Sequence, residues 1–438
     1  MPALKFRSTA RRSPDVTLRE AALRGLAPDG GLYLPVELPR LSPQDLLALR
    51  SLPFTEMSFR VLKPFVQEEV PDAALREALR DALDFPVPVA ELAPEFSVVE
   101  LFHGPTLAFK DFGARFMARL MFHLLGEDRR TLTVLAATSG DTGGAVAHGF
   151  FGVPRTRVVV LYPAGRVAEA QERQFTTLGG NVTALEVAGT FDDCQRLAKQ
   201  ALADSELRQS LLLSSANSIN IARLLPQMLY YFWAGAQSPD DGLPVVFSVP
   251  SGNFGNLTAG ILAWRMGLPS EGFIAATNCN DVVPQYLHSG SFLPRASRQS
   301  LSNAMDVGNP SNFARLADLF GNDLAAMRGI ICGRGFSDEE TMRAMRSVHE
   351  RYAYLVDPHT AVGILGWEAF RSEQSKKTRG IVLATAHPAK FAGVVAQATG
   401  VVPPAPESLS RPTCPENKLS RRIPASFKKL KKVLREAG

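Results

Sequence analysis

Residues 102–113, FHGPTLAFKDFG, hold a lysine in surroundings that would change its chemistry. Lys110 stands close to Leu107, Phe109 and Phe112, and an amine among apolar side chains is partly desolvated. Desolvation lowers the pKa of the amine, which frees it to attack a carbonyl carbon and form a Schiff base. A lysine that merely extends its ammonium to the solvent at the start of a helix would have the same sequence. The segment alone leaves both interpretations open.

A second segment combines hydroxyl side chains with small residues. Residues 138–144, TSGDTGG, follow the apolar run TLTVLAA and precede the helix-forming stretch AVAHGF. Free backbone N–H groups at the start of a helix attract a carboxylate or a phosphate. The candidate ligand contacts are therefore Ser139, Gly140, Asp141 and Thr142. A helix start that is only well capped fits the same residues.

A third segment, SGNFGN at residues 251–256, follows the run VVFSVP. Two glycines three residues apart let the backbone approach an anion closely, and the helix that follows directs its N–H groups at it. This pattern favours a phosphate cradle over a plain turn. It is neither GxGxxG nor a loop that ends in GK[ST], so a dinucleotide or a nucleoside triphosphate is not indicated.

The three segments need elements that bring them to one place. Short apolar runs recur, each followed by turn residues and a stretch with helical spacing: TLTVLAA, RVVVLYPA, LLLSSAN, VVFSVPSG, GFIAATN and GIVLATAH. Apolar runs without alternation are typical of strands buried on both faces, and the helices between them supply the crossovers of a parallel sheet. The pattern predicts an α/β fold. Ligands of such sheets bind beyond the carboxyl ends of the strands, where these segments lie.

Composition limits the class of protein. A chain of 438 residues, 45% hydrophobic and 21% charged, is typical of a globular protein with more than one lobe. No apolar run approaches the ~20 residues of a membrane span, and we expect a cytoplasmic protein. The net charge of +5 comes without a basic block beside aromatic residues, which disfavours nucleic-acid binding. The cysteines Cys194, Cys279, Cys332 and Cys414 form no CxxC pair, so neither a metal site nor a disulfide framework is predicted.

Taken together, the segments resemble the threonine synthase family, within the fold-type II group of pyridoxal-phosphate enzymes. FHGPTLAFKDFG is similar to the family's cofactor-lysine motif, ATSGDTGGAVAH to its substrate loop, SVPSGNFGNLTAG to its phosphate loop and ATAHPAKF to its C-terminal motif. The likeness continues through GLAPDGGLYLP, SSANSINIARLLPQ and LSNAMDVGNPSN, in the same order. The likeness covers most of the chain, and the match is close to the bacterial form of the family.

The resemblance implies a role for each matching position. Lys110 would form the Schiff base with pyridoxal 5'-phosphate, and Thr385 would contact the pyridine nitrogen. The cofactor phosphate would lie on Gly252, Asn253, Phe254, Gly255 and Asn256, and the substrate carboxylate on Ser139, Gly140, Asp141 and Thr142. Asn217, Asn220 and Arg223 would hold the substrate phosphate, although they could equally cap and pack a helix. Lys390 is the alternative cofactor lysine, but it lacks the apolar surroundings of Lys110.

The implied activity is that of a lyase in amino-acid biosynthesis. It would convert O-phospho-L-homoserine and water to L-threonine and phosphate by γ-elimination and β-hydration, the last step of threonine biosynthesis. The alternative is a related phospho-lyase or dehydratase that releases 2-oxobutyrate, because cofactor motifs do not specify a substrate. The sequence does not distinguish a monomer from a homodimer.

The expected layout has four parts. Residues 1–95 would form a small N-terminal unit, and residues 96–130 with 238–400 a large cofactor-binding lobe. Residues 131–237 would form a smaller α/β lobe, which the resemblance implies to be an insertion. Residues 401–438, Pro-rich and then basic, would form a helical tail.

Overall fold

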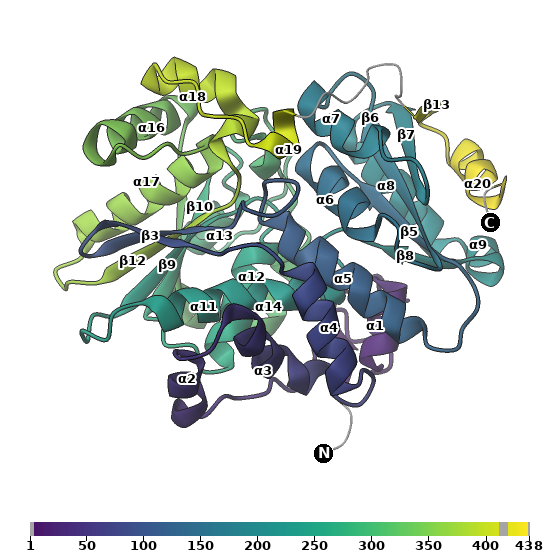
Figure 1. Ribbon diagram of the computed structural model, residues 1–438, viewed down its shortest axis with the longest axis horizontal. Coiled ribbons are helices and arrows are strands. Elements are labelled where there is room, and N and C mark those ends of the chain that lie inside the picture. Colours follow the sequence, from purple (N-terminus) through teal and green to yellow (C-terminus); the bar gives the residue numbers. More distant parts are fainter. Residues whose placement is uncertain (1–3, 411–418, 437–438) are drawn as a thin grey trace.

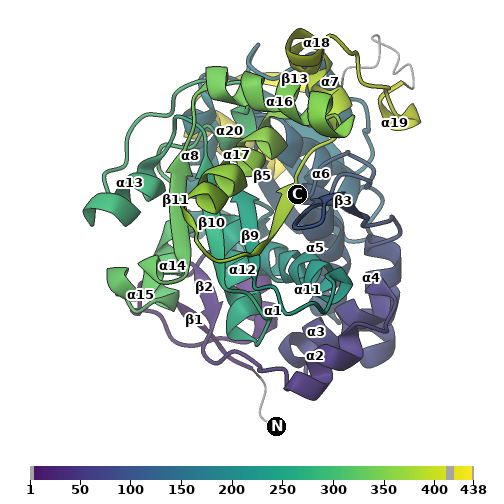
Figure 2. The ribbon, with the colours of Figure 1, turned by 90° about the vertical axis from the view of Figure 1, so that its left-hand side faces the viewer.

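The larger of two mainly parallel sheets has the strand order β11-β10-β9-β12-β4-β3, in the computed structural model that describes residues 4–410 and 419–436. Its strands are β3 (Val89–Ala93), β4 (Phe96–Glu100), β9 (Val245–Pro250), β10 (Gly272–Thr277), β11 (Ile331–Gly335) and β12 (Arg379–Ala384). All neighbours are parallel except β3, which runs antiparallel to β4 at the edge. Figure 2 shows β11, β10 and β9 side by side.

The smaller sheet is wholly parallel, with the order β13-β7-β6-β5-β8. Its strands are β5 (Leu132–Ala137), β6 (Thr156–Pro163), β7 (Val182–Ala188), β8 (Leu212–Ser215) and β13 (Ser420–Pro424). In Figure 1 this sheet and its helices form the right-hand lobe, and the larger sheet lies in the left-hand lobe. The predicted α/β fold is confirmed, and all six apolar runs form strands.

Helices cover both faces of each sheet, as parallel strands buried on both faces require. Around the larger sheet, α17 packs across β9, β10 and β12, and α12 and α13 contact β10. Its helices are α5 (Lys110–Leu125), α10 (Ile221–Leu224), α11 (Leu229–Gln237), α12 (Gly255–Arg265), α13 (Val282–Ser289), α14 (Phe313–Leu319), α15 (Leu324–Arg328), α16 (Asp338–Tyr352), α17 (Pro358–Glu373) and α18 (Ala392–Thr399). Three 3₁₀ helices are η1 (Leu225–Met228), η2 (Asn303–Met305) and η3 (Pro388–Phe391).

Around the smaller sheet, α8 packs against β5, β6 and β8, and α6 packs against β5 and β6. The helices of this lobe are α6 (Asp141–Phe150), α7 (Glu169–Thr176), α8 (Phe191–Ala203), α9 (Ser205–Ser210) and α20 (Phe427–Glu436). The short α19 (Glu407–Ser410) lies near α7 in Figure 1. No helix in residues 4–410 and 419–436 is long and apolar enough to cross a membrane.

The N-terminal segment packs onto both lobes. It contains the antiparallel pair β1 (Phe6–Ser8) and β2 (Tyr33–Pro35), with helices α1 (Leu18–Arg24), α2 (Pro43–Leu49), α3 (Phe54–Val66) and α4 (Asp72–Ala82). Its buried side chains belong to the same hydrophobic cluster as α5 and α12, so it shares their core. The proposed boundary at residue 95 falls between β3 and β4, which pair with each other.

The basic C-terminal segment contains a strand that its sequence did not indicate. Strand β13 pairs with β7 at the edge of the smaller sheet, and α20 then packs on α8. Leu430, Val433 and Leu434 of α20 are buried in the core of the smaller lobe. These contacts support assigning residues 420–436 to the smaller lobe, within a domain division that stays a proposal. Cys414 lies outside the described residues.

Candidate functional site

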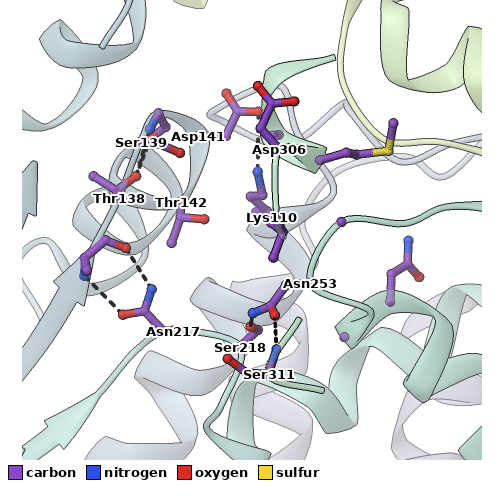
Figure 3. Close-up of a pocket in the computed structure, with 18 of the residues that line it drawn as sticks. Lys110, Thr138, Ser139, Asp141, Thr142, Asn217, Ser218, Asn253, Asp306 and Ser311 are labelled. Carbon is purple, nitrogen blue, oxygen red and sulfur yellow. Dashed lines mark hydrogen bonds and ion pairs between the residues drawn. The ribbon is translucent and has the colours of Figure 1, made fainter. Parts of the chain in front are cut away.

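One cavity is lined by residues of all three candidate segments, which follow β4, β5 and β9 in the chain (Figure 3). Every predicted site residue except one lines it: Lys110, Ser139, Gly140, Asp141, Thr142, Asn217, Arg223, Gly252, Asn253, Phe254, Gly255, Asn256 and Thr385. The exception is Asn220. The smaller sheet contributes the first wall, the larger sheet the second, and α5 the lysine between them.

Lys110 is the first residue of α5, and a short backbone pairing fixes its position relative to Thr385. The N–H of Phe109 donates to the carbonyl of Thr385 at 2.9 Å, and the N–H of His387 donates to the carbonyl of Leu107 at 3.1 Å. Leu107 adopts a φ of 56°, in the left-handed region, which turns the chain into α5. The lysine and Thr385, which is 6% exposed, therefore enter one cavity from adjacent segments.

The Lys110 amine lies in a site that opposes its protonation. Its side chain is 15% exposed. Burial lowers the pKa of Lys110, and the charges of Lys390 and Arg223 lower it further, whereas Asp141 acts in the opposite direction. The apolar sequence around Lys110 predicted a desolvated amine, and the burial of the side chain in the structure agrees with that prediction. An amine with a lowered pKa can react with a carbonyl carbon at neutral pH.

Asp141 is the only acidic side chain among the predicted contacts, and two lysines next to it favour its charged form. It begins α6 and is almost fully buried. Burial opposes its charge, but Lys390 and Lys110 together hold the pKa of Asp141 well below its usual range. Gln171 Nε2 donates to Asp141 Oδ1 at 2.8 Å. The carboxylate is therefore a fixed negative charge and a poor proton acceptor.

The loop before α6 is shaped by a threonine. Thr138 Oγ1 accepts hydrogen bonds from the N–H groups of Gly140, at 3.0 Å, and Gly143, at 2.8 Å. Ser139 is exposed at the tip of the loop, and Thr142 is partly buried one residue into α6. The hydroxyls of Ser139 and Thr142 thus reach the cavity at a helix N-terminus, where an anion is favoured.

The segment 251–256 forms a cradle at the start of α12. Phe254 adopts a φ of 60°, which directs the chain into the helix. A Cβ atom on Gly252 would lie 2.7 Å from Met305 Cα, so only glycine fits beneath the neighbouring loop. Asn253 is fixed at both ends of its amide, since Nδ2 donates to Ser218 Oγ at 2.5 Å and Oδ1 accepts from Ser311 N at 2.6 Å.

Asn256 supplies an unsatisfied donor at this cradle. Its Oδ1 accepts from the hydroxyls of Tyr230 and Tyr231 at 2.7 and 2.8 Å, which fixes the orientation of the amide. Its Nδ2 is buried and has no hydrogen-bond partner within the described part of the chain. A buried donor normally has an acceptor, so a ligand oxygen would satisfy it. These features fit a phosphate group.

The structure separates the three candidate contacts for a second phosphate. Arg223 is 4% exposed and lines the cavity, and its Nη1 donates to the Ala216 carbonyl. Burial lowers the pKa of Arg223 to about 10, and no carboxylate pairs with it in residues 4–410 and 419–436. Asn217 also lines the cavity, but its amide bonds both backbone groups of Ala137. Asn220 does not line the cavity. Its side chain caps the N-terminus of α10, which is the structural role that the sequence left open for it.

The predicted contacts omit one wall of the cavity. Residues 303–307, Asn309, Ser311 and His359 line it, although only the family likeness of LSNAMDVGNPSN pointed to that region. His359 Nδ1 lies 2.6 Å from Asp357 Oδ2, and its Nε2 accepts from Ala304 N at 3.1 Å. The signal in the sequence is a long stretch rich in Ser, Asn and Gly after strand β10, where an active-site loop is expected.

Comparison with known proteins matches the whole chain. Sequence profiles match for a pyridoxal-phosphate dependent enzyme at residues 89–385, the threonine synthase N terminus at 5–83 and the threonine synthase C-terminal region at 360–433. The threonine synthase of Serratia marcescens is 45% identical over 433 residues, covering 98% of this chain and 99% of that protein. That of Escherichia coli is 44% identical over 436 residues, with 98% and 99% covered.

Solved structures agree. The crystal structure of threonine synthase from Escherichia coli superposes with a TM-score of 0.92 at 43% identity, covering 99% of this chain and 100% of that one. A structure of pyridoxal-phosphate-bound threonine synthase from Brucella melitensis gives 0.90 at 38%, with 99% of both chains covered. A threonine deaminase from Solanum lycopersicum, at 16% identity and a TM-score of 0.58, shares the fold. The chain belongs to the threonine synthase family of pyridoxal-phosphate-dependent enzymes.

Proposed function

We propose that this enzyme converts O-phospho-L-homoserine and water to L-threonine and phosphate. The observation that carries the proposal is the single cavity in which Lys110, a phosphate cradle and the buried guanidinium of Arg223 meet. The substrate and the cofactor each bring a phosphate, and the cavity offers two separate positively polarised regions for them.

The described residues fit pyridoxal 5'-phosphate. Lys110 would hold the cofactor, the residues from Gly252 to Asn256 would bind its phosphate, and Thr385 would contact its ring nitrogen. The unsatisfied Nδ2 of Asn256 supports this assignment, because a phosphate oxygen would give that buried donor an acceptor. When bound, the cofactor supplies a conjugated ring that accepts the electrons released by proton abstraction.

The chain's own groups would then position the substrate and move protons. We assign its carboxylate to the hydroxyls and N–H groups of Ser139, Gly140 and Thr142, and its phosphate to Arg223 with Asn217 alongside. A guanidinium matches phosphate geometry through paired N–H donors. The Lys110 amine, with its lowered pKa, is the general base that removes the α-proton and returns protons in later steps.

Incubation of the purified protein with O-phospho-L-homoserine tests the proposal. We expect L-threonine and phosphate in equal amounts, with 2-oxobutyrate as a minor product at most. Lys110→Ala should abolish threonine formation and the visible absorbance of the attached cofactor, whereas Lys377→Ala, on the exposed surface, should change neither. If 2-oxobutyrate is the main product, the enzyme is instead a phospho-lyase of the same fold.

A further inference from the structure

Asp141 lies between two buried lysines, only one of which the sequence places in the reaction. Its Oδ1 is 2.5 Å from Lys390 Nζ, and its Oδ2 is 3.6 Å from Lys110 Nζ. The side chains of Lys390 and Asp141 are 2% and 3% exposed. The shorter contact is a direct, buried ion pair, and the longer one exceeds hydrogen-bonding distance.

Lys390 is also tied to the turn that leads to Lys110. It belongs to η3, five residues after Thr385, and its Nζ donates to the carbonyl of Thr106 at 2.8 Å. Thr106 in turn donates from N and Oγ1 to Asp111 at 2.8 and 2.7 Å. The Lys390 ammonium therefore connects the first residue of α6 with the turn before α5.

The two distances show which lysine forms the direct ion pair with the Asp141 carboxylate. In a buried site a direct ion pair strongly favours the charged forms of both partners. If Lys110 formed that pair, it would be held as an ammonium and could not attack a carbonyl carbon. Lys390 and the Gln171 amide occupy Oδ1, so Lys110 is left with a longer contact and a second positive charge nearby.

Other charged groups around this pair come from several elements. Arg223 of α10 faces Lys110 and adds to the positive potential there. His359 of α17 faces Asp141, and Asp306 lines the same cavity from the loop after η2. None of these is as close to Asp141 as Lys390 among the ion pairs of the described residues.

We propose that Lys390 is a positioning residue that binds the Asp141 carboxylate, denies it to Lys110 and so keeps the Lys110 amine free of its proton. The inference rests on the proposed function, in which that amine reacts with a carbonyl and transfers protons. Lys390 needs no contact with the substrate for this role. Its effect is exerted through Asp141.

Competitive acetylation of the full-length chain, with its cofactor removed, measures the protonation of Lys110 directly. Trace acetic anhydride is applied across a pH series, and mass spectrometry follows the peptide that contains Lys110, with the exposed Lys377 as internal reference. Lys390→Gln keeps a donor and loses the charge. In this variant we expect the pH at which Lys110 is half-labelled to rise by about one unit, a tenfold change in proton affinity, because Asp141 then pairs with Lys110.

Two further variants separate charge from shape. Lys390→Arg keeps the cation and should return the midpoint toward that of the wild type. In an Asp141→Asn background, Lys390→Gln should shift the midpoint much less, because no carboxylate is released. An unchanged midpoint in Lys390→Gln, or an equal shift in Lys390→Arg, would overturn the proposal. If Lys390→Gln does not fold, Lys390→Met should raise the midpoint in its place, and an unchanged midpoint in that variant would also overturn the proposal.

The labelling experiment contains no substrate, so it is independent of the reaction assigned above. If the wild type forms threonine but the Lys110 midpoint does not move in Lys390→Gln, only the role proposed for Lys390 is rejected and the proposed reaction stands. In the cofactor-loaded enzyme, Lys390→Gln should lower kcat at least tenfold at neutral pH with little change in KM, since protonated Lys110 affects chemistry more than binding. A merely structural lysine would lower the melting temperature and leave the labelling midpoint in place.

Discussion

At the scale of single residues, two buried carboxylates near Lys110 differ in their electrostatics. Asp141 has two lysines around it and is held ionised. Asp111, one residue after Lys110, accepts hydrogen bonds from Thr106, but its surroundings favour the proton. Burial raises the pKa of Asp111 to about 6, in spite of those hydrogen bonds. The pKa values of two neighbouring acids of the same type are thus shifted in opposite directions.

The raised pKa of Asp111 predicts a pH-dependent cost to stability. The folded chain binds this proton more tightly than the unfolded chain, whose pKa is near 3.8. Stability from this group therefore falls as pH rises between about 4 and 6 and is constant above. Asp111→Asn removes the cost, because the Thr106 hydroxyl can reverse and accept from the new amide. Relative to wild type, the variant should gain on the order of 2 kcal/mol between pH 4 and 7.

Denaturant unfolding of the two proteins at pH 4, 5, 6 and 7 measures that gain. Asp240→Asn, at an exposed position, is the matched control for the loss of one negative charge. A stability difference between Asp111→Asn and wild type that stays level across this range would contradict a raised pKa at Asp111.

At the scale of elements, the cavity depends on how loops are held against strands. Arg315 of α14 is fully buried and donates to the carbonyls of Tyr33, Ser218 and Ile219 and to the side chain of Asn312. It thereby joins β2 to the wall of the cavity beside the phosphate cradle. Because a buried guanidinium needs several acceptors, these loops are fixed relative to one another.

Two glycines of the cradle predict different outcomes for the same substitution. A Cβ on Gly252 would lie 2.7 Å from Met305 Cα and 2.9 Å from the Ala304 carbonyl, which are backbone atoms. A Cβ on Gly255 would meet its nearest atom at 3.4 Å. Gly252→Ala should therefore destabilise the cofactor-free chain by about 1–3 kcal/mol through overpacking, and Gly255→Ala by little. Thermal unfolding without cofactor measures this, and equal losses would contradict the geometry.

Continuous apolar runs were enough to predict six strands. Of these, β5, β6, β9, β10 and β12 lie inside the sheets and need apolar residues on both faces, and β8, at an edge, is packed against α1, α8 and α9. The edge strand β13, SRRIP, carries two adjacent arginines and buries only Ile423, so it lacks that pattern. The segments of the cavity were predictable because each has a local signal. The contact of Lys390 with Asp141 joins distant parts of the chain, and no local spacing indicates it.

At the scale of the whole molecule, the C-terminal segment completes the smaller lobe. After α18 of the larger lobe, the chain contributes β13 to the edge of the smaller sheet, beside β7 (Figure 1). Lys431 of α20 contacts Asp204 at 2.8 Å and Glu206 at 2.9 Å, next to the buried apolar face of the helix. The smaller sheet is therefore built from two separate stretches of sequence, residues 132–215 and residues 420–424.

This arrangement predicts that a C-terminal side chain matters to the lobe that holds Asp141. Leu434 is fully buried in the core formed with α8, whereas the Lys432 side chain on the same helix is 68% exposed. Leu434→Ala should cost about 2–5 kcal/mol, since it removes buried methyl groups and leaves a cavity. Lys432→Ala should cost less than about 0.5 kcal/mol, because an exposed ion pair contributes little.

Hydrogen exchange then locates the loss of stability in Leu434→Ala. Helices α20 and α8 and strand β7 should lose protection, and the strands of the larger sheet should keep theirs. Loss of protection confined to α20, with unchanged exchange in β7, would show that the helix is an appendage and not part of the lobe's core.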